Sequence, residues 1–431
     1  MCTPALRYTI GAAFAGLMAA SAAAQVPAAH RTVLIHAAVF DGTPTWQRDR
    51  TIVIDDSMIS AIDSGAAPAA RTGDVLIDLH GRFVIPGLID AHVHLATDPD
   101  HEDARPRAVA RLAAAIRGGV TTVRDMAGDT RRLADYARDA AVTDTPSPDI
   151  RYAALFAGPA FFADPRTHAA SAGAVAGQVP WMRAITDTTD LRQAVAEAKG
   201  TGATAIKLYA ALDSLTVARV VAEAHRQGML VWAHAALRPA MPRDMAASGL
   251  DAMSHGNLLA LAIPPAQRTA LQRELGTTTG IESPPLDSVL RAMAARHIVF
   301  DPTLVVMDSG AQLTLAAAVT RRAHQLGVLI STGTDSIGAA DSMSLPNVHL
   351  EIALLVRRAG FTPVEALVAA TENGARTLGI FGHVGSLVPG KRADLVVLAA
   401  DPLRDITNTT TVRLVMKRGV IFRRDASIDS R

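Results

Sequence analysis

The chain has 431 residues, 42 lysines and arginines against 41 aspartates and glutamates, and one cysteine, Cys2. Its length allows two or three ordinary domains or one large barrel with an attachment, and 49% hydrophobic against 19% charged residues excludes a disordered chain. The net charge of +1 speaks against a nucleic-acid-binding domain, and the single cysteine excludes a disulfide framework and a cysteine-based zinc finger.

The first segment, residues 1–24, has the pattern of a secretory signal peptide. Arg7 is its one charge, an apolar run follows over 10–20, and small residues lead up to Ala24 and Gln25. The apolar run is shorter than the roughly 20 residues that a membrane span needs. We therefore predict cleavage near Ala24-Gln25 and a periplasmic or secreted protein without a stable membrane anchor; the alternative is an uncleaved anchor.

Short strand-like runs separated by turns occupy both ends of the chain. They predict a small composite β-sandwich, with residues 25–86 as its first part and 381–431 as its second. The predicted strands are 32–40, 51–54, 58–62, 75–79, 82–85, 394–398 and 412–422.

The middle, residues 87–380, alternates between strand-like and helical runs. Eight such repeats favour a (β/α)8 TIM barrel over an open doubly wound sheet, and no dinucleotide-binding fingerprint is present. Weak periodicity over 156–186 and 257–284 predicts long loops near the barrel mouth. The predicted strands are 88–95, 120–125, 151–157, 203–210, 229–234, 252–255, 297–304 and 328–335, with helices between most of them, for example 107–117, 191–198, 215–227 and 286–295.

Two histidines, His92 and His94, end the first barrel strand. A spacing of two residues places both side chains on one face of a strand, where the imidazoles can share a metal ion. Taken alone the pair is weak, since core histidines are common. The position strengthens it, because barrel enzymes keep their catalytic groups at the carboxyl ends of the strands.

Three more side chains of metal-ligand type close later strands: His234, His255 and Asp335. Each could be a structural residue with a satisfied hydrogen bond. Because all of these strand ends meet at one barrel mouth, together they predict a metal site.

Lys207 lies inside an apolar strand, although only four of the basic residues in the chain are lysines. A buried ammonium is costly without a partner. One interpretation is a salt bridge to a neighbouring carboxylate. The other is that the lysine is neutralised or converted into an acid.

The chain resembles the metal-dependent amidohydrolase superfamily, in its imidazolonepropionase-like and secreted prolidase-like branch. The resemblance covers most of the chain after the predicted signal peptide and implies a barrel with a composite β-sandwich from the two ends. The segments that carry it are 84–95, 119–125, 206–207, 233–235, 254–256, 333–336 and 385–395.

This resemblance implies a role for each predicted ligand. His92, His94 and Asp335 would bind the more buried metal, and His234 and His255 the second. Lys207 would be carboxylated by CO₂ and bridge the two divalent ions, expected to be zinc, although Mn, Fe and Co can use the same ligands. A bridging hydroxide would attack an amide carbonyl, and Asp335 would pass its proton to the leaving group.

Three residues are candidates for contacting the substrate. Tyr209 is two residues beyond Lys207 on the same strand face, so it could donate to a developing oxyanion or simply form part of the barrel wall. Arg166 and His168 follow the third barrel strand and could bind a substrate carboxylate, although loop charges are usually solvated.

The sequence therefore predicts a secreted binuclear metallohydrolase that cuts amide bonds in small molecules. Dipeptides, including those with a C-terminal proline, and N-acyl amino acids are the leading substrates. A mononuclear enzyme that opens a cyclic amide or deaminates a ring is the alternative. A more remote one is a non-catalytic binding or scaffold protein, which would be expected to have lost ligands. A homo-oligomer is possible, as in many relatives, but no interface is readable from the sequence.

Overall fold

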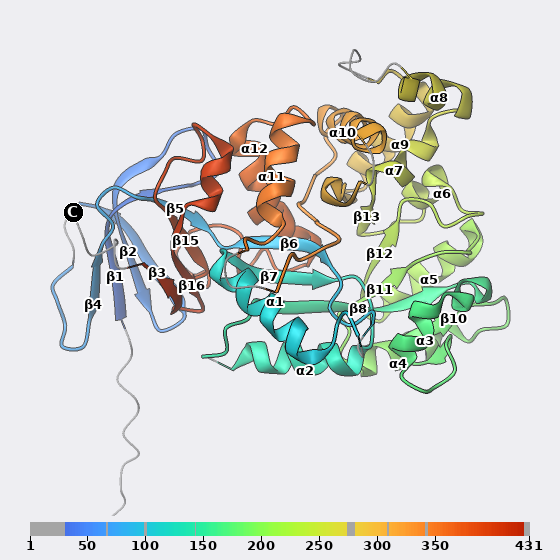
Figure 1. Cartoon of the computed structure of the whole chain (residues 1–431), viewed down its shortest axis with the longest axis horizontal. Coiled ribbons are helices and arrows are strands. Elements are labelled where there is room, and N and C mark those ends of the chain that lie inside the picture. Colours follow the sequence, from blue (N-terminus) through green and yellow to red (C-terminus); the bar gives the residue numbers. More distant parts are fainter. Residues whose placement is uncertain are drawn as a thin grey trace, which may run out of the picture.

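The computed structural model describes residues 31–65, 68–98, 101–142, 144–273, 281–307, 310–340 and 344–425. The predicted signal peptide and its cleavage site lie outside these residues. Figure 1 shows a sheet that combines the two ends of the chain, blue and red, beside a barrel formed by the middle of the chain. No helix in the described ranges is long and apolar enough to cross a membrane.

The sheet formed by the two chain ends has the strand order β17-β16-β15-β5-β1-β2-β3, and β4 pairs with β1. Side chains of β15 alternate between two cores. Leu395 and Val397 belong to the core formed by the terminal strands themselves, whereas Val396 and Leu398 belong to the core that the sheet shares with the barrel. The strands are β1 Arg31–Val39, β2 Gln47–Asp55, β3 Met58–Ser64, β4 Val75–Asp78, β5 Phe83–Pro86, β15 Leu395–Leu398, β16 Val412–Lys417 and β17 Val420–Arg424.

The predicted single strand over 412–422 is wrong, because the structure divides it into β16 and β17. Arg418 and Gly419 form the turn between them with positive φ angles of 52° and 77°. The two arms then pair antiparallel with each other.

Seven parallel barrel strands follow one another around the barrel, as predicted. They are β6 Leu88–Val93, β7 Val120–Asp125, β8 Asp149–Ala157, β11 Ala205–Leu208, β12 Leu230–His234, β13 Ala252–Ser254 and β14 Val299–Asp301.

The eighth barrel position is filled by the segment 328–335, but not by the continuous strand that the sequence predicts. Only Ile330 makes a strand-type bridge, to Phe300. Beyond it, the backbone N–H of Thr332 turns to the carbonyl of Ala369 at 3.2 Å. The carbonyl of Thr332 accepts from the N–H of Ala91 at 2.8 Å, which closes the barrel onto β6.

Helices cover the outside of the barrel (Figure 1). Aspartates cap several of them, as Asp129, Asp190 and Asp213 accept hydrogen bonds from first-turn N–H groups. The α-helices between barrel strands and after them are α1 Arg105–Arg117, α2 Thr130–Ala141, α4 Leu191–Gly200, α5 Ser214–Arg226, α6 Pro242–Ala247, α9 Pro284–Ala295, α10 Gly310–Gln325, α11 Val348–Arg357, α12 Pro363–Val368 and α13 Gly374–Thr377. Other helical segments are the 3-10 helices η3 Leu304–Val306 and η5 Ile406–Thr410 and the π-helix η4 Ala369–Asn373.

The two segments predicted as long loops contain short elements instead. Because each spans only a few residues, none produces a readable hydrophobic period. The first segment contains η1 Pro159–Ala163, α3 Pro165–Ser171, β9 Gln178–Val179 and β10 Met182–Ala184, and the second contains α7 Gly256–Leu259, η2 Ala260–Ala262 and α8 Pro265–Arg273.

Ion pairs fasten the terminal sheet to the barrel. Asp149, the first residue of β8, lies 2.6 Å from Arg392, 3.4 Å from Lys417 and 3.0 Å from Arg418. Burial raises the pKa of Asp149, but these three cations outweigh it and hold the pKa below its usual range.

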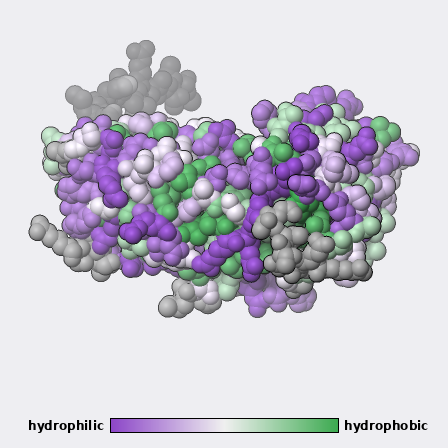
Figure 2. All heavy atoms as spheres, turned by 90° about the horizontal axis from the view of Figure 1, so that it is seen from above, coloured by the Kyte–Doolittle hydropathy of each residue, from purple (hydrophilic) through white to green (hydrophobic). Residues whose placement is uncertain are grey.

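Figure 2 shows the face of the molecule that is seen from above in the orientation of Figure 1. Polar residues cover most of this face, and hydrophobic residues gather toward its middle.

Candidate metal centre

The predicted metal ligands gather at the carboxyl ends of the barrel strands, as expected for barrel enzymes. They come from five different places in the barrel wall, so only the closed fold brings them together. His92 lies in β6 and His94 directly follows it, Lys207 lies in β11, His234 ends β12, His255 follows β13, and Asp335 ends the eighth segment.

Three of these side chains form the tightest group. Asp335 Oδ1 lies 3.4 Å from His92 Nε2 and 3.2 Å from His94 Nε2. One ligand atom from each of the three residues can be chosen so that all three atoms lie within 4.8 Å of one another. This spacing suits a single divalent ion.

His255 and His234 continue the group across the barrel mouth. The ring centroids of His92 and His255 are 4.9 Å apart, and those of His255 and His234 are 4.6 Å apart. The four histidine rings therefore form one connected cluster.

In each of the four histidines, Nδ1 lies within hydrogen-bonding distance of another protein group. The partner is Asp301 Oδ2 at 2.6 Å for His92 and the Ala127 carbonyl at 3.3 Å for His94. It is the Tyr209 carbonyl at 2.8 Å for His234 and Thr303 Oγ1 at 2.9 Å for His255. Such contacts direct the other ring nitrogen toward a metal.

Two buried polar atoms at the centre have no hydrogen-bond partner among the described residues: His92 Nε2 and Lys207 Nζ. Unpaired buried polar atoms are costly, which indicates a group that they bind. The residues present therefore fit a metal. The salt bridge proposed as one interpretation of Lys207 is absent among the described residues.

Burial favours the neutral form of His92, His234, His255 and Lys207, whereas the Asp335 carboxylate outweighs burial at His94 and raises its pKa. Burial lowers the pKa of His92 to about 4 and that of His255 to about 3, and it lowers the pKa of His234 well below its usual value. Burial also lowers the pKa of Lys207 to about 7. Neutral imidazole and amine are the forms that bind a metal and react with CO₂, respectively.

The backbone is strained around the cluster. His255, Thr303 and Asp335 have positive φ angles of 76°, 52° and 55°. A β-branched residue such as Thr303 is a rare occupant of this region, and strain of this kind gathers at functional sites. The conformation at Asp335 is fixed by its N–H, which donates to the His92 carbonyl at 2.7 Å.

Several residues around the ligands were not singled out as ligands or supports from the sequence. Asp301, the last residue of β14, and Arg124 in β7 are fully buried and paired at 2.6 Å. The rule that found His234, a polar side chain closing an apolar strand, also fits Asp301. Asp90 and Asp125 hold the backbone and side chains next to the ligands: Asp90 accepts from Thr334 Oγ1 at 2.7 Å, and Asp125 accepts from the Leu95 N–H at 2.7 Å.

Only two of the three candidate substrate contacts lie beside the cluster. Tyr209 and Arg166 line a small cavity together with His94. Burial raises the pKa of Tyr209, and the Arg166 guanidinium beside it opposes that shift. His168 is exposed on α3 and does not line the cavity. His349 in α11 is buried, and its Nε2 lies 2.9 Å from the Gly118 carbonyl.

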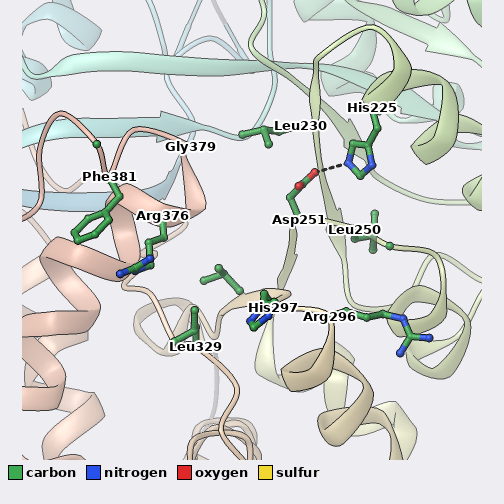
Figure 3. A pocket seen from close by; sticks show the side chains of 13 residues that line it. His225, Leu230, Leu250, Asp251, Arg296, His297, Leu329, Arg376, Gly379 and Phe381 are labelled. Atoms are coloured by element: carbon green, nitrogen blue, oxygen red, sulfur yellow. Dashed lines mark hydrogen bonds and ion pairs between the residues drawn. The ribbon is translucent and has the colours of Figure 1, made fainter.

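A larger cavity, of about 660 Å³, lies at the opposite end of the barrel (Figure 3). Leu230 and Val299, the first residues of β12 and β14, line it, as does Asp251, which pairs with His225 at 2.9 Å. None of the predicted metal ligands lines this cavity. This cavity is therefore separate from the histidine cluster.

Two hydrolases are among the known proteins whose sequences are similar to this chain. The imidazolonepropionase of Chloroflexus aggregans is 34% identical over 160 residues, which cover 35% of this chain and 36% of that enzyme, about a third of its length. The ochratoxinase of Aspergillus niger is 25% identical over 434 residues, 89% of this chain and 84% of the relative.

Solved structures share the fold over nearly the whole chain. The A. niger ochratoxinase structure matches with a TM-score of 0.71 and 21% identity, covering 92% of this chain and 97% of that one. A putative prolidase from Bifidobacterium longum matches with a TM-score of 0.68 and 26% identity, covering 93% and 98%. The amidohydrolase family itself matches residues 83–422, which include all of the clustered side chains, and the chain belongs to that family.

Proposed function

We propose that this protein is a metal-dependent hydrolase of amide C–N bonds in small molecules. The observation that carries the proposal is the cluster of histidines whose Nδ1 atoms all contact other protein groups. Beside it lie Asp335 and the buried Lys207, whose Nζ has no hydrogen-bond partner in the described part of the chain. Dipeptides, with Xaa-Pro the leading type, and N-acyl amino acids are the proposed substrates.

In this proposal His92, His94 and Asp335 would hold one metal and His234 and His255 a second, with zinc the leading ion. The neutral amine of Lys207 would add to CO₂ and release a proton, and the resulting carbamate would supply anionic oxygen donors to these ions. When bound, such ions polarise a carbonyl and lower the pKa of water.

The side chains of the chain supply the rest of the chemistry. The Asp335 carboxylate accepts the proton of the attacking water and delivers it to the leaving nitrogen. The Tyr209 hydroxyl is proposed to donate to the oxyanion that develops as the carbonyl is attacked. In support, Tyr209 is next to the cluster, with its ring centroid 4.2 Å from that of His234.

Arg166 is proposed to bind the carboxylate of the substrate. Its guanidinium lies at the small cavity beside Tyr209, where Asp164 holds it through Nε and Nη2. We expect Arg166→Gln to raise KM about 10–100-fold for substrates with a free carboxylate, as loss of a charge-assisted hydrogen bond predicts. The same substrates with the carboxylate amidated should be unaffected. His168→Gln, two residues away and outside the cavity, is the matched control; an equal effect in both variants would contradict the assignment.

A mononuclear enzyme that opens a cyclic amide remains a second candidate. It is favoured by the tight grouping of His92, His94 and Asp335, which His234 and His255 do not join within the same limit. The partial match to imidazolonepropionase supports the same candidate.

The test is hydrolysis and metal content measured on one preparation. We expect protein produced with zinc and bicarbonate to cleave members of a panel of dipeptides, N-acyl amino acids and lactams. Chelation should remove the activity and zinc should restore it. Fully metallated protein that cleaves nothing in the panel would contradict the substrate class. A folded protein that binds no metal would contradict both candidates.

A further inference from the structure

A buried chain of side chains, Arg124–Asp301–His92, crosses the barrel interior beneath the histidine cluster. All three residues have essentially no solvent exposure. Asp301 uses both carboxylate oxygens: Oδ2 lies 2.6 Å from His92 Nδ1, and Oδ1 accepts from Arg124 Nη2 at 2.6 Å. Asp301 therefore contacts the Nδ1 side of the His92 ring, whereas Asp335 lies near Nε2.

Arg124 is itself held from two further sides. Its Nε donates to the Ala91 carbonyl on β6, next to His92 in the chain, and its guanidinium carbon lies 4.8 Å from the Trp232 ring centre. A fully buried carboxylate needs such a cation to stay ionised. The guanidinium therefore links three barrel strands and fixes the charge of Asp301.

The backbone of the eighth segment is shaped around the same contact. A Cβ atom at Gly333 would lie 2.8 Å from His92 Cβ and 3.0 Å from Asp301 Cβ. The absence of a side chain at Gly333 thus allows the His92–Asp301 pair to form. This packing is independent of the hydrogen bonds.

We propose that Asp301 and Arg124 are positioning residues of the metal site, which hold His92 in the Nδ1–H tautomer with Nε2 directed at the metal. A carboxylate that accepts from Nδ1–H fixes the ring orientation and makes the other nitrogen a better ligand. The inference rests on the proposed metal site but is not part of the ligand set itself. Asp301 is a positioning residue and not a ligand, because its oxygens are already used.

Metal affinity measures this role without any substrate. Metal-free protein is titrated with Zn²⁺ against a chromophoric chelator. We expect Asp301→Asn to bind zinc about 10–100-fold more weakly than wild type, the usual effect of losing such a partner. The control is Asp287→Asn, which removes a bidentate pair with Arg322 on the outer helices. It should bind zinc like wild type.

A second measurement uses the wild-type chain alone, so it does not depend on whether a variant folds. The ¹⁵N shifts of the metal-free protein should show the His92 ring as the Nδ1–H tautomer, with its signals identified by their loss in His92→Asn. An Nε2–H tautomer, or an Asp301→Asn variant that binds zinc as tightly as wild type, would overturn the positioning role. A wild type that binds no zinc would instead contradict the proposed function.

Discussion

Replacing Asp335 by asparagine is expected to lower kcat for amide hydrolysis by about 10²–10⁴-fold, the usual contribution of a positioned acid–base group. The amide keeps the shape of the carboxylate but cannot accept the proton of the attacking water. Asparagine also tolerates the left-handed backbone at this position, where φ is 55°, so the fold should be kept. Single-turnover kinetics with the best substrate of the panel would measure the loss.

Asp335 also lies within reach of His92 and His94, so the variant could lose metal as well as its base. Metal per chain must therefore be measured on the same sample, and the rate compared at equal metal content. Asp251→Asn provides the control, because Asp251 pairs with a histidine at the opposite end of the barrel. Wild-type rates in Asp335→Asn at full metal content would contradict the proton-transfer role.

The pH dependence follows from the charge state of Asp335. Burial would raise its pKa, but His92, His94 and His255 outweigh burial and hold it well below its usual range. The group is therefore ionised throughout about pH 5–8 and should produce no acid limb there. An acid limb near about pH 6 that is present in the wild type and missing in Asp335→Asn would contradict this assignment.

The ligand cluster was predictable because its rule is local. Each of His234, His255 and Asp335 closes an apolar run, and in a parallel barrel all strands end at the same face. The barrel was predictable for the same reason, since each strand and helix carries its own hydrophobic period. The family and the fold could thus be predicted from features that a few neighbouring residues encode.

What the sequence did not predict depends on contacts between distant residues. Asp301 and Arg124 are 177 positions apart, and only the closed barrel shows that they pair. The eighth strand failed as a strand because Thr332 and Thr334 bond to Ala369 and Asp90 instead of continuing the ladder. His349 lies in the middle of the chain's last third but is covered by η5, whose Thr409 Oγ1 lies 3.1 Å from His349 Nδ1 and 60 positions further along the sequence.

Lys207 separates the two proposed kinds of site most sharply. The two-metal proposal predicts that Lys207→Met reduces bound metal from about two ions per chain to about one or none, because the variant lacks the amine that CO₂ modifies. Hydrolysis should fall with it. A carbamate signal from ¹³C-bicarbonate should be present in the wild type and absent from Lys207→Met. Lys199→Met, which changes an exposed lysine in α4, is the control for both measurements.

The same substitution should stabilise the metal-free fold, which distinguishes lost function from lost structure. Burial lowers the pKa of Lys207 to about 7, whereas the unfolded chain keeps its proton up to its ordinary value near 10.5. Proton binding therefore favours the unfolded chain below the unfolded pKa, fully so below about pH 7, by up to about 5 kcal/mol. Methionine fills similar space without that cost, so denaturant unfolding near neutral pH should show a more stable variant.

One metal per chain in the wild type together with full activity of Lys207→Arg would instead support the mononuclear site, in which this lysine carries no carbamate.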